Sequence, residues 1–278
     1  MADFQVLVPL DGSPLADHVL PWVERLCRGA RERGESPRVH LLTVLPDPDP
    51  AAATAARTHQ AEVQARLERA GLAVEPHLRT GAAPGEAIVA CARGVAPDLI
   101  AISSHGRSGV MRLVLGSVAE HVLRHAEHPL LLVTPRTDAP GPVGKILVPL
   151  DGSERSAAIL PLVERFAAAE KAGVVLVRAI WDPATRPVMA AAFTPEWVVG
   201  TLEPWKERLE RAGLQVEAKG AFGAAGREIP AVAEEVGAGL IAMATRGHEG
   251  LVRLLDGSVS EQVLRHARLP LLVVRAPE

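Results

Sequence analysis

Aromatic side chains are scarce in this 278-residue chain: tyrosine is absent, and aromatic residues make up only 3% of the total. Surfaces that stack nucleic-acid bases are built largely from aromatic side chains, and this chain has too few of them to form such a surface. The formal net charge of −3 comes from interspersed residues of both signs and provides no basic field for a phosphate backbone. We therefore expect no nucleic acid among the partners of this protein.

Cysteines and long apolar runs are also scarce. Cys27 and Cys91 are the two cysteines, and their pattern predicts reduced thiols on helices rather than a disulfide or a metal pair. No apolar run reaches the length that spans a membrane, and no basic-then-apolar leader follows Met1. These absences predict a cytoplasmic protein with no membrane partner.

The two halves of the chain repeat the same short motifs. The segment VPLDGS at residues 8–13 returns at 148–153, and GSV at 116–118 returns at 257–259. A repeat this long indicates a duplicated domain rather than a solenoid. We expect one domain over residues 1–136, a linker rich in proline and glycine over 137–144, and a second domain over 145–278.

Apolar runs alternate with helical periodicity in both halves. Strands are expected at 6–10, 39–45, 73–79, 99–103 and 130–134, then at 146–150, 174–180, 215–219, 240–244 and 271–274. Helices are expected between them, at 14–31, 51–70, 85–94 and 110–126, then at 157–171, 195–212, 228–236 and 251–267. This alternation predicts two α/β domains, each a parallel sheet with helices on both faces. The connection at 181–196 is a candidate flap.

Two turns carry the residues that suggest a binding site. Asp11 follows the first strand, and a glycine-rich turn with Gly106 and Gly109 follows the fourth, ahead of Gly116-Ser117 in a predicted helix. Ligands of open α/β sheets bind at the carboxyl ends of strands whose helices leave to opposite faces. If strands one and four are neighbours, the aspartate faces the glycine turn, whose N–H groups are suited to an anion.

Each turn alone is a weak signal, because Asp-Gly-Ser after a strand is usually a plain turn and cap. Their joint occurrence at matching places in both halves strengthens the interpretation. The phosphate-binding motif Gly-x-x-x-x-Gly-Lys-Ser/Thr is absent, and no Gly-x-Gly-x-x-Gly follows the first strand.

Together these residues resemble the universal stress proteins in their tandem two-domain form. Nucleotide-binding members of that family carry Gly-x-x-Gly, nine residues, then Gly-Ser/Thr, which Gly106 with Gly116-Ser117 and Gly247 with Gly257-Ser258 match in part. The resemblance implies five-stranded parallel sheets of order 3-2-1-4-5 and binding of ATP, with AMP or ADP as alternatives and Mg²⁺ as an accompanying ion. The residues it assigns to the nucleotide are Pro9, Asp11, Val44, Ser103, Gly106, Gly116, Ser117 and Val118, then Pro149, Asp151, Ala179, Ala244, Gly247, Gly257, Ser258 and Val259.

Within that assignment, the aspartates contact ribose, Pro9, Val44 and their counterparts surround adenosine, and the glycines and serines hold ribose and phosphates. Ser103 and Ala244 stand where the family has its first glycine, and Asp256 adds a negative charge beside Gly257. Like charge near a triphosphate disfavours binding. We therefore expect the better site in the first half.

The resulting hypothesis is an adenine-nucleotide-binding stress-response protein for which ATP is a ligand or a very slow substrate. The sequence contains no strong hydrolytic apparatus, so any ATPase is expected to be weak. The alternative is a protein-interaction module that has lost nucleotide binding through Ser103 and Ala244. A related ATP-pyrophosphatase or nucleotidyl transferase is disfavoured, because the Ser-Gly-Gly and His-x-Gly-His signatures are absent. The resemblance further implies a pseudo-dimer of the two domains through their fifth strands, or a homodimer of chains.

A histidine group offers a competing metal hypothesis. His121 and His125 lie four residues apart on a predicted helix, with His128 beyond, a spacing that can bind zinc. No carboxylate of a His-Glu-x-x-His motif accompanies them, so we interpret them as surface or helix-end residues and predict no metal site.

Overall fold

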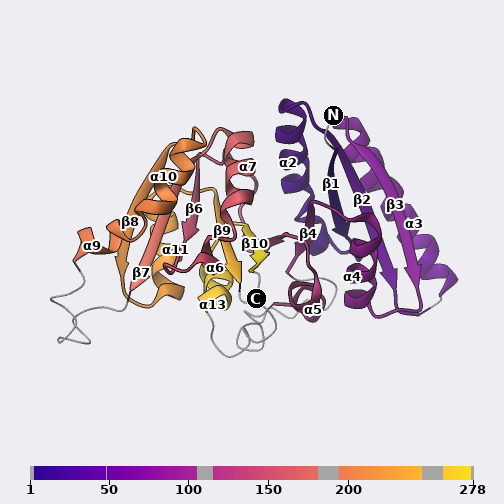
Figure 1. Ribbon diagram of the computed structural model, residues 1–278. Coiled ribbons are helices and arrows are strands. Elements are labelled where there is room, and N and C mark those ends of the chain that lie inside the picture. Colours follow the sequence, from indigo (N-terminus) through magenta and orange to yellow (C-terminus); the bar gives the residue numbers. More distant parts are fainter. Residues whose placement is uncertain (1–2, 48, 105–114, 181–193, 246–258, 277–278) are drawn as a thin grey trace. The chain divides into compact units, whose positions relative to one another are not determined.

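The computed structural model describes residues 3–47, 49–104, 115–180, 194–245 and 259–276, and it divides the chain into two compact units (Figure 1). Unit 1 comprises Met1–Ala139 and unit 2 comprises Pro140–Glu278. The predicted domain limits and the linker at 137–144 stay predictions.

Unit 1 is an α/β layer structure around a parallel sheet in which the strand order is β3-β2-β1-β4-β5. Its strands carry Leu, Val and Ile almost continuously, and every residue of β4 and β5 is buried, as expected for a sheet covered on both faces. The elements are β1 (Asp3–Pro9), α1 (Pro14–Asp17), α2 (Leu20–Glu32), β2 (Ser36–Leu45), α3 (Pro50–Arg69), β3 (Ala73–Thr80), α4 (Pro84–Val95), β4 (Leu99–Ser103), α5 (Ser117–His125) and β5 (Leu130–Val133).

Unit 2 repeats this architecture with the order β8-β7-β6-β9-β10, again parallel. The predicted fold class and the order 3-2-1-4-5 are therefore confirmed. Its described elements are β6 (Lys145–Pro149), α6 (Glu154–Ala157), α7 (Leu160–Glu170), β7 (Gly173–Ile180), α9 (Pro195–Gly200), α10 (Glu203–Arg211), β8 (Val216–Phe222), α11 (Ala225–Glu235), β9 (Leu240–Thr245), α13 (Val259–His266) and β10 (Leu271–Arg275).

The helices of unit 1 are divided between the two faces of its sheet. On one face, Arg66 of α3 forms an ion pair of 2.7 Å with Glu24 of α2, and His59 of α3 pairs with Asp17 of α1 at 3.0 Å. On the other face α4 packs on α5, where Gly85 lies directly against the ring of His121. The helices that follow β1 and β4 therefore leave the sheet on opposite sides.

Two helices that the sequence predicts as continuous are broken in the structure. The predicted helix at 14–31 is split into α1 and α2, and the one at 195–212 into α9 and α10, whereas the one at 157–171 corresponds to α7 and starts at Ala157, the last residue of α6. A proline lies in the first turn of α2, α7 and α10, namely Pro21, Pro161 and Pro204. Proline has no N–H to donate to the preceding turn but fits the start of a helix, so the chain ends one helix and begins another.

A further correction concerns the glycine-serine pair. The sequence predicts Gly116-Ser117 inside a helix over 110–126, but Gly116 is the extended residue that caps α5 (φ −64°, ψ 149°) and the helix begins at Ser117. The N–H of Gly116 donates to the carbonyl of Ser104 at 2.8 Å, which ties the start of the helix to the end of β4. Residues 105–114 lie outside the described residues.

Two expectations from composition can be compared with the structure. Cys27 on α2 and Cys91 on α4 are both free and buried, as predicted. Burial raises the pKa of Cys27 to about 12, which keeps its thiol protonated. Among the described residues, none of the helices combines the length and the apolar character that crossing a membrane requires.

Candidate functional site

The carboxyl ends of β1 and β4 lie side by side in unit 1. The two strands pair in parallel, with Val6 opposite Leu99 and Leu7 opposite Ile100. Because the helices after these strands cover opposite faces, the pair forms the switch point at which open α/β sheets bind ligands. The condition set by the sequence, that strands one and four are neighbours, is met.

The turn after β1 holds its carboxylate in a fixed orientation. Asp11 Oδ1 accepts a hydrogen bond of 2.9 Å from the N–H of Ser13, and Ser13 Oγ accepts one of 3.2 Å from the N–H of Ala16, which caps α1. Between them Gly12 has φ of 78°, a left-handed conformation that costs glycine least. The turn is thus also a structural cap, and Asp11 remains half-buried at the edge of the sheet.

The start of α5 supplies N–H groups at the neighbouring strand end. Gly116 has no side chain to cap the helix, and the carbonyl of Gly116 accepts from the N–H of Glu120 at 2.8 Å. The N–H groups of the first helical turn, from Ser117 onward, have no acceptor within a helix. With the positive end of the helix dipole they form an environment that favours an anion.

Ser103 ends β4 beside these groups. It is 7% exposed, and its Oγ has no hydrogen-bond partner among the described residues. A buried hydroxyl without a partner costs free energy, so such an atom points to a ligand or a water that would complete it. This is the position at which the family pattern has a glycine.

The remaining predicted residues of unit 1 differ in exposure. Pro9 is buried, Val44, Gly116 and Val118 are half-buried, and Ser117 is exposed. Gly106 lies outside the described residues.

In unit 2 the equivalent carboxylate, Asp151, also accepts hydrogen bonds from its own turn. Asp151 is exposed, and its Oδ1 accepts both from the N–H of Ser153 at 2.9 Å and from Ser153 Oγ at 2.6 Å. The strands β6 and β9 are neighbours, with Ile146 opposite Leu240. Of the other predicted residues, Pro149 is buried, Ala179 and Ala244 are half-buried and Val259 is 41% exposed, while Gly247, Gly257 and Ser258 lie outside the described residues.

Unit 2 also has a cation at this edge that the sequence reasoning missed. The guanidinium of Arg178 lies beside Gly152, where an added Cβ would approach Nη1 to 2.8 Å, and its Cζ lies 5.5 Å from the ring centre of Trp197. From the strand registers, the matching residue in unit 1 is the buried Thr43. An arginine inside an otherwise apolar strand was the available signal. The switch points of the two units are therefore chemically different.

Comparison with known proteins decides the family. Residues 4–134 and 142–275 each match the Universal stress protein family, so that most of the chain is covered by two copies. The chain belongs to the universal stress protein family. The tandem organisation expected from the repeated turns is thereby confirmed.

Individual relatives agree with this assignment. A universal stress protein of Methanocaldococcus jannaschii is 31% identical over 144 residues, which cover 48% of this chain and 83% of the relative. The universal stress protein YxiE of Bacillus subtilis is 30% identical over 145 residues, 47% of this chain and 98% of the relative. A crystal structure of a universal stress protein from Archaeoglobus fulgidus covers 98% of both chains with a TM-score of 0.77 and 22% identity, a likeness of fold.

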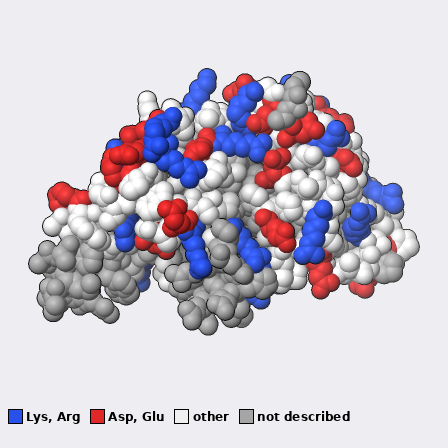
Figure 2. Space-filling view, in the orientation of Figure 1, with Lys and Arg blue, Asp and Glu red and all other residues white. Residues whose placement is uncertain are grey.

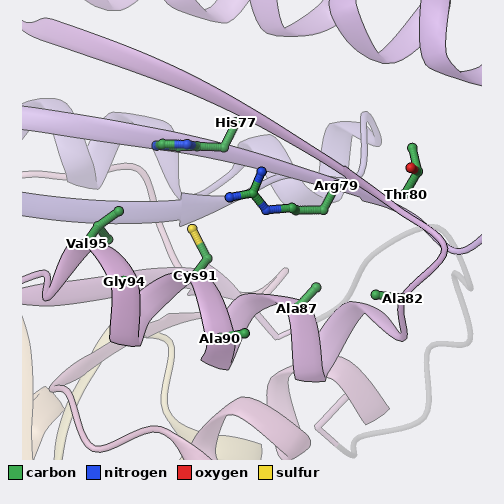
Figure 3. A pocket seen from close by; sticks show the side chains of 9 residues that line it. All are labelled: His77, Arg79, Thr80, Ala82, Ala87, Ala90, Cys91, Gly94 and Val95. Carbon is green, nitrogen blue, oxygen red and sulfur yellow. The ribbon is translucent and has the colours of Figure 1, made fainter.

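A cavity of about 500 Å³ in this universal stress protein lies elsewhere, between β3 and α4 (Figure 3). His77 and Arg79 of β3 line one side, and Cys91 of α4 points toward them from the other. Burial raises the pKa of the Cys91 thiol, with Arg79 acting in the opposite direction. None of the residues assigned to the nucleotide lines this cavity.

The helical histidines lie on α5, where His121 packs against Gly85 of α4. The rings of His121 and His125 stack with centroids 4.2 Å apart, and His125 Nδ1 hydrogen-bonds the carbonyl of His121 at 2.9 Å. Within the described ranges, the one group of three potential metal ligands lies on other elements.

Figure 2 shows acidic and basic side chains intermingled on the face in view.

Proposed function

We propose that this universal stress protein binds an adenine nucleotide, ATP foremost, at the switch point of unit 1. Asp11 accepts a hydrogen bond from a ribose hydroxyl, and Pro9 and Val44 contact the adenosine moiety. The start of α5, from Gly116 to Val118, receives the phosphates together with Gly106, and Mg²⁺ accompanies them. ATP serves as a ligand or a very slow substrate in a stress-response role in the cytoplasm.

One observation carries this proposal: the adjacency of β1 and β4 brings the Asp11 turn and the start of α5 to the same edge of the sheet. A carboxylate that accepts hydrogen bonds and a helix start that attracts anions match the two ends of a nucleotide. The hydroxyl of Ser103, which has no hydrogen-bond partner among the described residues, lies at the same edge and supports the assignment.

The second site is proposed to be weaker. Asp151 accepts two hydrogen bonds from Ser153, and Asp256 adds a negative charge beside Gly257 that disfavours a triphosphate. The guanidinium of Arg178 also lies against Gly152 of the same turn. We therefore propose one tight nucleotide site per chain.

Equilibrium binding of labelled ATP to the full chain tests the proposal. A net hydrogen bond to a charged group contributes about 1.5–3 kcal/mol, so Asp11→Ala is expected to weaken binding roughly 10- to 100-fold. Asp151→Ala should leave the tight site unchanged. Asp138→Ala removes an exposed carboxylate of the same unit and is the matched charge control.

Because Asp11 also holds its own turn, its loss could act through folding. Asp11→Asn retains an acceptor for the Ser13 N–H and separates the two effects. Equal and negligible binding by wild type and Asp11→Ala would overturn the proposal. It would favour the alternative, a protein-interaction module without nucleotide. The association of the two units through their fifth strands stays a prediction.

A further inference from the structure

Three potential metal ligands come together in unit 1, away from the switch point. His40 on β2 and Glu75 on β3 are register partners, and His77 lies two residues further along β3, on the same face of the sheet. His40 Nδ1 lies 3.0 Å from His77 Nε2 and 3.7 Å from Glu75 Oε2, and His77 Nε2 lies 3.8 Å from Glu75 Oε1. All three ligand atoms are within 4.8 Å of one another.

These separations suit a tetrahedral metal. When two imidazole nitrogens and a carboxylate oxygen lie about 2.0–2.2 Å from zinc, the ligand atoms are roughly 3.3–3.6 Å apart. The three atoms in unit 1 need to move by only a few tenths of an ångström to meet that geometry. Two histidines and one glutamate also form a known zinc donor set, which leaves one coordination position for water.

The surroundings orient the first histidine as metal sites require. His40 Nε2 lies 3.0 Å from Oε1 of Gln5 on β1, so a proton on Nε2 is donated to the amide and Nδ1 keeps its lone pair. A partner on the second ring nitrogen is the usual arrangement around metal-bound histidine. His40 is 5% exposed and His77 14%, whereas Glu75 is 49% exposed and leaves a path for an ion from solvent.

Neighbouring cations limit the affinity. Arg38 Nη1 lies 3.8 Å from Glu75 Oε2, although both side chains are about half exposed and such a pair is weak in water. Arg79 follows His77 on the same face and lines the adjoining cavity. A divalent ion must outcompete Arg38 for the carboxylate, which the chelating histidines make feasible.

Unit 2 shows what the same positions become without the histidines. The strand registers match Gln5, Glu75 and His77 to Lys145, Glu217 and Lys219. There Lys145 Nζ forms an ion pair of 2.7 Å with Glu217 Oε1, and Lys219 Nζ pairs with Glu235 at 2.6 Å. The carboxylate that both units share is thus paired with a lysine side chain in unit 2, whereas in unit 1 it lies beside two imidazoles.

We propose that His40, Glu75 and His77 form a binding site for one divalent transition-metal ion of the zinc class in unit 1. The ion joins β2 to β3, an edge strand whose residues are all at least partly exposed. Its role is to fix that edge. The site is independent of the nucleotide proposal.

Titration of the chelator-treated full chain with Zn²⁺ by calorimetry, with metal analysis after dialysis, tests the site. One ion per chain is expected, with binding at least tenfold weaker in Glu75→Gln and lost in His77→Gln. The thermal midpoint of the wild type should rise with Zn²⁺, because the ion binds only the folded state, and that of Glu75→Gln should not. Co²⁺ should give the intense visible absorption of four-coordinate cobalt in the wild type only.

A double variant, His121→Gln with His125→Gln, is the control for the other histidine pair. It should bind Zn²⁺ as the wild type does. Glu75 is half exposed, so Glu75→Gln keeps the test decisive even if His77→Gln folds poorly. An unchanged affinity for Zn²⁺ in Glu75→Gln, or loss of Zn²⁺ binding in the control variant, would overturn the proposal. His40 and His77 would then be interpreted as a hydrogen-bonded pair without a metal.

Discussion

The backbone of Ala96, at the end of α4, lies in the left-handed region with φ of 47° and ψ of 59°. That conformation brings the side-chain Cβ close to the following carbonyl and costs a non-glycine residue about 1–2 kcal/mol. At the matching place in unit 2 the chain has Gly237, with φ of 65°. Unit 2 therefore has glycine, the residue that adopts this conformation without strain, where unit 1 has alanine.

Ala96→Gly is expected to stabilise unit 1 by roughly 1 kcal/mol, because relief of the strain exceeds the extra entropy of an unfolded glycine. Urea denaturation of the full chain measures the change. Gly237→Ala should produce the opposite shift in unit 2, where no atom lies within 4 Å of the added Cβ to complicate the result. A stabilising effect of Gly237→Ala would contradict the argument.

Two half-buried histidines make the stability of unit 1 depend on pH. Burial is the main cause that lowers the pKa of His121 and of His128 below the ordinary 6.5. Below about pH 6.5 the unfolded chain therefore binds protons that the folded chain does not, so stability falls as pH falls through 6.5 toward the lowered values.

Urea midpoints at about pH 7.5 and about pH 5.5 should show this loss. The double variant His121→Gln with His128→Leu introduces the residues that unit 2 has at the matching positions, Gln262 and Leu269. It should show a flatter pH dependence. A slope as steep as that of the wild type would assign the effect to other groups.

At the scale of elements, the contact between α4 and α5 depends on a glycine. A Cβ on Gly85 would lie 2.7 Å from the ring of His121 and 2.8 Å from its Cβ. The copy in unit 2 repeats this contact, with Gly226 of α11 against Gln262 of α13. Close approach of the two helices therefore requires glycine at this position.

Gly85→Ala is expected to destabilise unit 1 by about 1–3 kcal/mol, because the helices must move apart to admit the methyl group. Gly94→Ala is the matched control on the same helix, where nothing lies within 4 Å and the substitution should stabilise by roughly 0.5–1 kcal/mol. Circular dichroism during urea denaturation measures both. Equal effects of the two substitutions would contradict the packing argument.

Element boundaries show where sequence reasoning succeeded and where it did not. The strand at 99–103 was predicted at its observed limits, because its apolar run is bounded by Asp98 and by polar residues. The start of α5 was predicted too early, because the apolar periodicity continues through Gly116, whereas Gly116 is extended and its N–H donates to Ser104. Pro21 and Pro204, which mark the breaks in the two divided helices, are visible in the sequence, but the helical periodicity continues through them.

At the scale of the whole molecule, the two units are expected to respond unequally to ATP. A ligand that binds only the folded form of one unit raises the stability of that unit by mass action. In calorimetry of the full chain, ATP should therefore raise the temperature of one part of the unfolding transition. The other part should unfold at the same temperature with and without ATP. In Asp11→Ala no part should shift, and equal shifts of both parts in the wild type would contradict the proposed inequality.

The sequence by itself determined the duplication, the fold class, the strand order implied by the family resemblance, and the turns that end β1 and β6. The duplication, the fold class and the turns follow from local patterns, namely apolar runs, turn residues and a repeated motif, whereas the strand order follows from the family resemblance. Only the tertiary structure showed Arg178 against the Asp151 turn and assembled His40, Glu75 and His77. Strand register and side-chain direction determine whether residues that are distant in the sequence come into contact. A shift of one strand by one position would move each of its side chains to the other face of the sheet.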